Sequence, residues 1–199
     1  AGTTGATIGG GIKENNFLGK GVKLNTNISL TKKGAKGSFT YEQPNFNYSD
    51  NSLLTSISST STDNLADFGY KTGETTVALA TKFQQYDNLY FTPQIKSSYE
   101  NLETTSKAST SLKKQEGNYL DTYFNYALDL DHRNNSYQPT DGTRYKFNQE
   151  LPIISNTAEI LNTVTVSGYK LLVYDMVGKI SVYGSTVGTL SGKDVRISK

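Results

Sequence analysis

The positions of three aspartates, Asp121, Asp129 and Asp131, differ by even numbers, so they fall on one side of an extended strand. A row of carboxylates can act as a proton donor and acceptor pair, or can ligate a metal ion. The alternative, which we favour, is that these three are polar side chains on the wet face of a sheet.

The single histidine, His132, follows the aspartates and precedes Arg133. At a strand end its ordinary role is that of a solvated side chain. The sequence contains no Ser–His–Asp order, phosphate-cradling loop or HExxH motif. We predict no enzyme, no cofactor and no metal site.

The aspartates belong to a stretch in which apolar and polar side chains alternate. The even-numbered residues from Leu120 to Leu130 fall on one face of a strand, and Asp121, Asn125 and Asp129 fall on the other. The first face suits lipid or a core, and the second suits water. If the sheet crosses a membrane, we expect Asp121, Asn125 and Asp129 to face the lumen.

A tight turn, Pro139-Thr140-Asp141-Gly142, ends this stretch. Proline fixes φ, and glycine supplies the positive φ that tight turns need, so we predict a positive φ at Gly142. Alternation then resumes up to Leu151, which makes the two stretches a long hairpin.

The rest of the chain repeats this unit, with about ten alternating stretches and no 3.6-residue period with caps. We therefore predict an all-β, antiparallel, up-and-down sheet. The longest loop is polar and is predicted to be a flexible surface segment. The expected connections at one end are 15–21, 46–51, 84–88, 131–142 and 174–178, and those at the other end are 32–37, 63–73, 101–117 and 154–158.

Composition narrows the class of protein. The chain has 35% hydrophobic residues, a mean hydropathy of -0.52 and no segment near the roughly 20 apolar residues that a spanning helix needs. A transmembrane barrel also looks polar on average, because its strands alternate. The absence of cysteine excludes a disulfide scaffold or thiolate metal site. The net charge of +2, with no basic stripe, argues against nucleic acid.

Strand length and aromatic placement favour a membrane barrel over a soluble sandwich. Several stretches run over about 11 to 15 residues, which suits a tilted membrane strand, whereas ordinary strands have about 5–6. Aromatic residues at one end resemble a membrane-interface girdle, although tyrosines packing on turns are the alternative. These aromatic residues are Phe17, Phe46, Tyr48, Phe83, Tyr86, Tyr137 and Tyr174.

Two turn motifs carry a family resemblance. The segment 15–21, which includes Asn16, Phe17 and Gly19, resembles the first periplasmic turn of the BamA-like outer-membrane assembly factors, the bacterial surface antigen family. The Pro-Thr-Asp-Gly-Thr-Arg run at 139–144 resembles another turn of that family, with Pro44-Asn45-Phe46 lying between the two motifs. The final segment 192–197 resembles the start of the family's long extracellular loop.

The resemblance implies that residues 1–199 are part of a 16-stranded barrel, about strands two to eleven. The first strand, the last five, the loop motif Val/Ile-Arg-Gly-Phe/Tyr and the periplasmic POTRA domains are then outside this chain. The chain begins without Met or a signal segment, so we expect a piece of a longer protein. Ten strands without the others should form an open, curved sheet.

The same resemblance implies a role in folding and inserting β-barrel proteins at the bacterial outer membrane. The implied partners are outer-membrane lipids, unfolded barrel clients and assembly-complex lipoproteins that bind through POTRA domains. Alternatives are a two-partner-secretion or translocation-assembly transporter, and a simple porin. Lys32, Lys33 and Lys36 could contact lipopolysaccharide, but we interpret them as a solvated charged turn.

Overall fold

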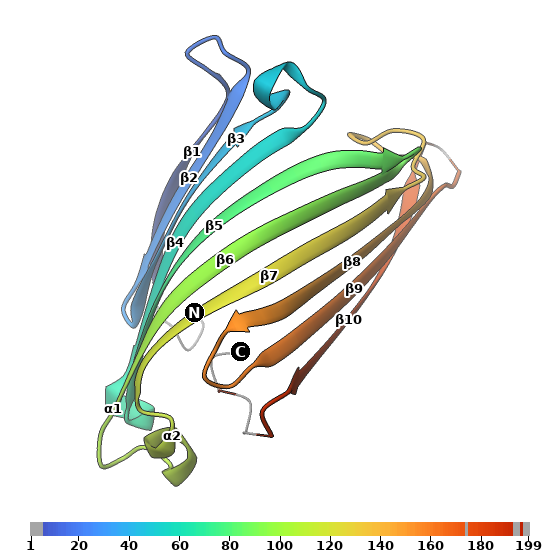
Figure 1. Ribbon diagram of the computed structural model, residues 1–199. Helices are drawn as coiled ribbons and strands as arrows, with labels where there is room; N and C mark the ends of the chain where they lie inside the picture. Colours follow the sequence, from blue (N-terminus) through green and yellow to red (C-terminus); the bar gives the residue numbers. More distant parts are fainter. Residues whose placement is uncertain (1–5, 174, 193–195, 197–199) are drawn as a thin grey trace.

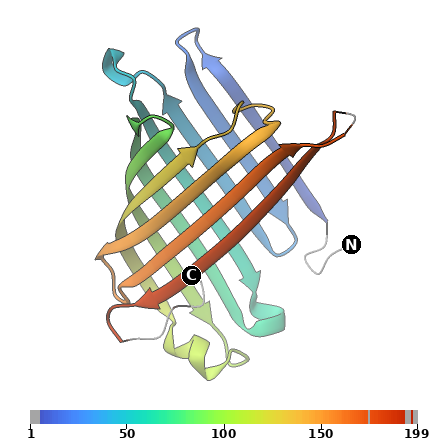
Figure 2. The same ribbon diagram turned by 90° about the vertical axis from the view of Figure 1, so that its right-hand side faces the viewer.

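Ten strands form one antiparallel sheet whose spatial order follows the order along the chain (Figure 1). The computed structural model describes residues 6–173, 175–192 and 196. Within these residues β1 and β10 do not pair, so the sheet curls without closing (Figure 2). The predicted all-β, up-and-down and open architecture is confirmed. The strands are β1 (Thr7–Phe17), β2 (Val22–Thr31), β3 (Gly34–Gln43), β4 (Ser52–Asn64), β5 (Tyr70–Tyr86), β6 (Leu89–Thr104), β7 (Gly117–Asp131), β8 (Asp141–Ile154), β9 (Glu159–Leu171) and β10 (Val177–Thr189).

Several strands continue further than the alternation predicts, so some predicted loop bounds are wrong. The expected loop 63–73 shrinks, because β4 and β5 stay paired up to Asn64 and Tyr70. The expected turn 32–37 is only Lys32 and Lys33. The added pairs are rich in Ser, Thr and Gly, whose backbones form ladder hydrogen bonds without any apolar side-chain pattern.

Three short helical turns also depart from the prediction of strands and loops alone: η1 (Phe46–Tyr48), α1 (Leu65–Phe68) and α2 (Thr110–Lys114). The side chain of Ser109 caps α2 by accepting a hydrogen bond from the backbone N–H of Leu112 (3.3 Å). No helix in the described parts of the chain is long and apolar enough to cross a membrane.

The predicted flexible loop 101–117 is mostly ordered by a small apolar cluster. Leu102, Ala108 and Leu112 are buried together, with Tyr70 packed against them. Their spacing follows neither a strand nor a helix period, so only the return of α2 onto the ends of β5 and β6 brings them into contact. The cluster fixes α1 and α2 at the same end of the sheet (Figure 1).

One face of the sheet is concave, and the ladder register identifies its residues. Side chains of Glu100 on β6 and Glu159 on β9 both reach Arg196. On a flat sheet three strand spacings would separate these two strands by about 14 Å. Their side chains converge because the sheet curls toward them. The register places Asp121, Asn125 and other polar residues on this concave face.

The convex face carries the apolar set, including Leu120 and the other even-numbered residues of β7. An aromatic row crosses it from β5 to β8, with ring centroids 5.5 Å apart for Phe83–Phe91, 6.2 Å for Phe91–Tyr126 and 6.0 Å for Tyr126–Phe147. Such neighbouring rings stabilise cross-strand packing.

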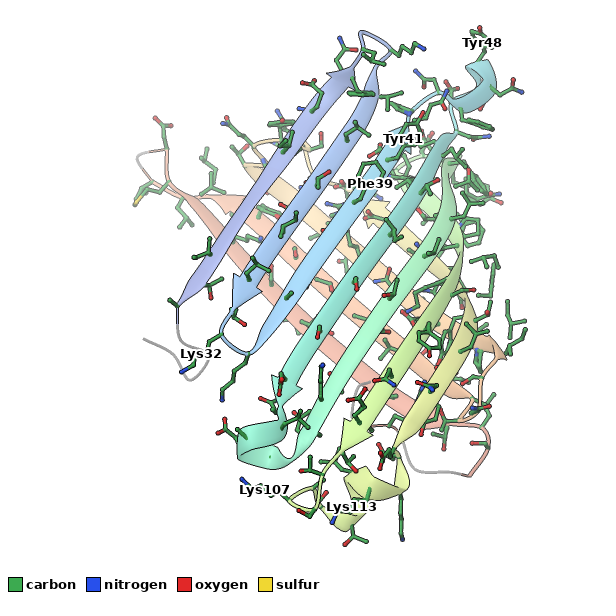
Figure 3. The ribbon with its side chains drawn as sticks, turned by 90° about the vertical axis from the view of Figure 1, so that its left-hand side faces the viewer. Lys32, Phe39, Tyr41, Tyr48, Lys107 and Lys113 are labelled. Carbon is green, nitrogen blue, oxygen red and sulfur yellow. The ribbon has the colours of Figure 1, made fainter. Side chains whose placement is uncertain are left out.

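Aromatic side chains are also exposed at the turns opposite α1 and α2. Phe17, Phe46, Tyr48, Tyr86 and Tyr137 are exposed there, and Tyr48 is fully exposed. Figure 3 shows Tyr48 at one end of the sheet and Lys32, Lys107 and Lys113 at the other. The last member of the predicted aromatic set, Tyr174, lies outside the described residues.

Candidate functional site

Three carboxylates from three strands surround one arginine on the concave face. Glu100, Asp121 and Glu159 project from β6, β7 and β9, and Arg196 reaches them from the segment after β10. Arg196 Nη1 donates to Glu100 Oε2 (3.1 Å), and its backbone N–H donates to Glu159 Oε1 (3.1 Å). Arg196 Nη2 donates to both Asp121 and Glu159. We call these four residues the arginine cage.

Two tyrosines complete the walls of the arginine cage. The guanidinium of Arg196 lies 4.7 Å from the ring centroid of Tyr119, which adds a cation–π contact. The hydroxyl of Tyr123 donates to Glu159 Oε2 (3.2 Å). The arginine thus contacts side chains from β6, β7 and β9 at once, and it ties these strands together.

Burial makes the charges of the arginine cage energetically important. Asp121 is 1% exposed and Arg196 is 3% exposed. Burial lowers the pKa of Arg196, but its hydrogen bonds to Asp121 and Glu159 outweigh burial and raise that pKa above the ordinary value. Removing one partner of such a group leaves unpaired buried charge. The cage therefore fixes the segment after β10 against the wall.

A second charged network lies at the other end of β7. Arg144 Nε donates to Asp129 Oδ1 (2.8 Å), and Arg133 holds Asp131 through Nε (2.7 Å) and Nη2 (2.6 Å). The hydrogen bonds to Asp131 raise the pKa of Arg133 above its ordinary value. The guanidinium of Arg133 also lies 5.8 Å from the ring centroid of Tyr169. These contacts close the loop between β7 and β8.

The predicted polar row on β7 does not form a carboxylate pair. Asp121 binds Arg196, Asp129 binds Arg144, and the side-chain amide of Asn125 donates to Gln94 Oε1 (3.1 Å). Each group thus has a separate partner along the strand. Within the described parts of the chain, no three His, Cys, Asp or Glu side chains are placed to hold a metal ion.

Sequence reasoning missed Glu100, Glu159 and Arg196 as members of a site. Glu100 falls on the polar side of its predicted strand, but nothing in that pattern distinguishes it from other polar residues. Arg196 follows a strand, and its partner carboxylates lie up to 96 residues away in the sequence. The one usable signal in the sequence was Arg196 itself, a charged residue in the loop predicted after a long strand.

The first predicted turn, after β1, is held by hydrogen bonds to Asn16 and by the positive φ of Gly19. The side chain of Asn16 accepts from the backbone N–H of Gly21 (2.6 Å), and its carbonyl accepts from Gly19 (3.0 Å). Gly19 has a φ of 69°. Phe17 is the last residue of β1 and not a turn residue, because it still pairs with Val22.

The second predicted turn is also partly strand. Asp141 and Gly142 are the first residues of β8, because they pair with β9. The side chain of Asn134 closes the preceding loop by accepting from the backbone N–H groups of Thr140 (3.0 Å) and Asp141 (3.1 Å). Pro139 directly precedes these groups and donates no N–H of its own.

Gly142 has a φ of 102°, so the predicted positive φ is confirmed. An added Cβ would lie 2.2 Å from the carbonyl oxygen of His132. The side chain of His132 is exposed, and its backbone N–H donates to Thr143 O (2.9 Å).

The final motif, 192–197, lies mostly outside the described residues. The structure describes only Gly192 and Arg196 of it.

Residues 16–198 match the Omp85 superfamily domain. A comparison with curated protein sequences finds no match. Among solved structures, the chain is similar to the crystal structure of BamA from Haemophilus ducreyi lacking POTRA domains 1-3, with a TM-score of 0.75 and 21% sequence identity. The similarity covers 96% of this chain and 40% of that chain. It shows a common fold, and the chain spans less than half of the length of that structure.

Proposed function

The chain belongs to the Omp85 superfamily, and we propose that it forms part of a bacterial outer-membrane barrel that folds and inserts other β-barrel proteins. The observation that carries this proposal is one continuous up-and-down sheet, apolar on its convex face and polar on its concave face. A membrane barrel needs this division, because lipid covers one face and water covers the other.

The polar residues of β7 have a defined place in this proposal. Asp121, Asn125 and Asp129 line the lumen, and Leu120, Phe124 and the other even-numbered residues contact lipid. Arg196 holds the segment after β10 against the lumen wall through Asp121 and its neighbours. The cage stiffens the strands β6 to β9, so opening of the barrel is confined to other strands.

The proposed reaction needs no covalent chemistry. The seam between the first and last strands of the complete barrel opens, and its unpaired N–H and C=O groups template an incoming client strand. The proposed partners are outer-membrane lipids, unfolded barrel clients and assembly lipoproteins that bind through POTRA domains. The turns beside Asn16, Phe17, Gly19 and Pro139 to Gly142 keep neighbouring strands in register.

Reconstitution tests this proposal. The complete protein is inserted in liposomes and mixed with a urea-unfolded outer-membrane barrel protein, and client folding is followed by the shift of the heat-modifiable band on gels. We expect faster folding than in protein-free liposomes. A folding rate equal to that of protein-free liposomes would refute the assembly role.

A translocation role is the second candidate, and the polar and charged concave wall favours it. Asp129, Arg144 and Lys96 can solvate a hydrophilic chain passing through the lumen. Protease treatment of the same liposomes separates the two roles. An inserted client yields a protected membrane core, whereas a translocated soluble client is fully protected within the vesicle.

A further inference from the structure

Two lysines from distant parts of the chain flank the short helix α1. The ammonium group of Lys33, from the β2–β3 hairpin, forms an ion pair with Asp67. The ammonium group of Lys107, from the β6–β7 connection, donates to the carbonyl oxygen of Ala66 (3.2 Å). Because Ala66 and Asp67 are adjacent, both cations lie beside one helical turn. We call Lys32, Lys33, Phe68 and Lys107 the α1 corner.

Backbone contacts fix the geometry of the α1 corner. The backbone N–H of Asp63 donates to Lys33 O (2.6 Å), which attaches the hairpin tip to β4. The backbone N–H of Thr105 donates to Gly69 O (2.8 Å), which attaches the other connection to α1. Gly69 has a φ of 74°, and a Cβ there would lie 2.5 Å from the backbone nitrogen of Ala108. The lysines therefore project from a rigid base.

The charge at this end of the sheet is positive. Asp67 partly neutralises Lys33. The hydrogen bond and the positive charge of Lys33 lower the pKa of Asp67 below 3.8. Each ammonium group has three donors, and the Lys33–Asp67 and Lys107–Ala66 hydrogen bonds use one donor each. Among residues 31–35, 61–73 and 101–118, the lysines are Lys32, Lys33, Lys71, Lys107, Lys113 and Lys114, and the carboxylates are Asp63, Asp67, Glu103 and Glu116.

An exposed phenylalanine lies among these cations. Phe68, the last residue of α1, directly follows Asp67 in the sequence, and its side chain is 61% exposed. The convex face of β2 and β4 carries further exposed apolar side chains, among them Leu30 and Ile57. A surface with lysines at its end and apolar residues along its wall is suited to the boundary between lipid headgroups and acyl chains.

We propose that the α1 corner binds the phosphorylated headgroup of lipopolysaccharide, with its acyl chains on Phe68 and the convex wall. Lys32, Lys33 and Lys107 contact the phosphates. Figure 3 shows Lys32 and Lys107 at the end of the sheet opposite the exposed Tyr48. Lys36 takes no part, because the register places it on the concave face. This inference rests on the proposed outer-membrane location but not on assembly activity.

The test measures binding of purified lipid A to the complete protein in detergent. The double variant Lys33→Gln/Lys107→Gln removes two charges of the α1 corner, and Lys13→Gln/Lys20→Gln removes two exposed lysines near the opposite end. We expect at least tenfold weaker binding for the first variant and unchanged binding for the second. Equal weakening of both, or of neither, would overturn the proposal, because it would show nonspecific attraction or no contact.

Four further measurements keep the test decisive. Asp67→Asn removes the competing carboxylate, so it should strengthen lipid A binding severalfold, which simple misfolding would not do. Phe68→Ser should weaken binding of lipid A, because the acyl chains lose an apolar contact. Dephosphorylated lipid A should bind at least tenfold more weakly, and millimolar inorganic phosphate should not displace lipid A. Displacement by phosphate would show a free-anion site and refute the lipid assignment.

The liposome folding reaction separates this inference from the proposed function. If the lysine variant loses lipid A binding while client folding proceeds at the rate of the unchanged protein, the lipid site stands by itself. If lipid A binding is unaffected by the variant, the lipid site is refuted, whatever the folding rate. A failure of client folding in the unchanged protein refutes only the assembly role.

Discussion

The guanidinium of Arg196 donates to the carboxylate of Asp121, 75 positions earlier in the sequence. Asp121 lies on the concave face near the start of β7, and Arg196 comes from the segment that follows the last described strand. Because both side chains are almost fully buried, this ion pair is poorly screened by solvent. It joins the chain after β10 to a strand on which it has no ladder contact.

Arg196→Ala should destabilise the protein by about 3–5 kcal/mol, because it leaves buried carboxylates without their cation. Urea unfolding in detergent, followed by the heat-modifiable band, measures this change. Glu159→Gln in the same protein should restore part of the loss, since it removes one unpaired charge. Lys179→Ala, at an exposed position, is the control. Equal losses for Arg196→Ala and the control would contradict the role of the cage.

Phe124→Arg should impair membrane assembly far more than Asn125→Arg. A lipid-facing arginine near the bilayer midplane costs about 2–4 kcal/mol, whereas a lumen-facing arginine stays in water. Quantitative immunoblots of folded protein in membrane fractions measure the difference. Similar yields of the two neighbouring variants would reject the proposed facing of β7.

Gly142→Val should hinder formation of the β7–β8 hairpin. Gly142 has a φ of 102°, and its missing Cβ leaves room for the carbonyl of His132. A β-branched residue is strained at that φ. Gly168→Ala is the matched control, because Gly168 lies on neighbouring β9 with open space around its Cβ position. The yield of refolded protein should fall only for the first variant.

Lys33→Gln should raise the pKa of Asp67 toward 3.8, because the hydrogen bond and charge of Lys33 hold it lower. The sign for stability follows from this lowered pKa. The Lys33–Asp67 contribution is present above the unfolded pKa and is lost as pH falls through the folded pKa. A carbon-13 NMR titration of the labelled carboxyl group measures the shift. An unchanged titration in the variant would show that the ion pair is absent in solution.

Residues 1–199 expressed alone should aggregate or depend on detergent. The edge strands β1 and β10 carry unpaired backbone groups, and the convex face exposes apolar side chains such as Ile12 and Ile180. Size exclusion and a thermal melt after refolding without detergent decide this. A monodisperse monomer with a cooperative melt would contradict a membrane-embedded sheet.

The sequence by itself determined the strands and the two faces of the sheet. Leu120 and Asp121 were assigned to opposite faces correctly, because successive side chains of a strand must alternate whatever surrounds it. The positive φ of Gly142 was equally predictable, since glycine adopts positive φ without the steric strain that a Cβ brings.

Only the tertiary structure decided which of these side chains meet. Glu100, Asp121 and Glu159 belong to three strands, and they reach one arginine because the sheet curls, a property that no single strand encodes. The alternation of apolar and polar residues also could not predict where the strands end or that α1 and α2 form. Backbone pairing continues through polar residues there, and Leu102 and Leu112 become neighbours only after the chain has folded back.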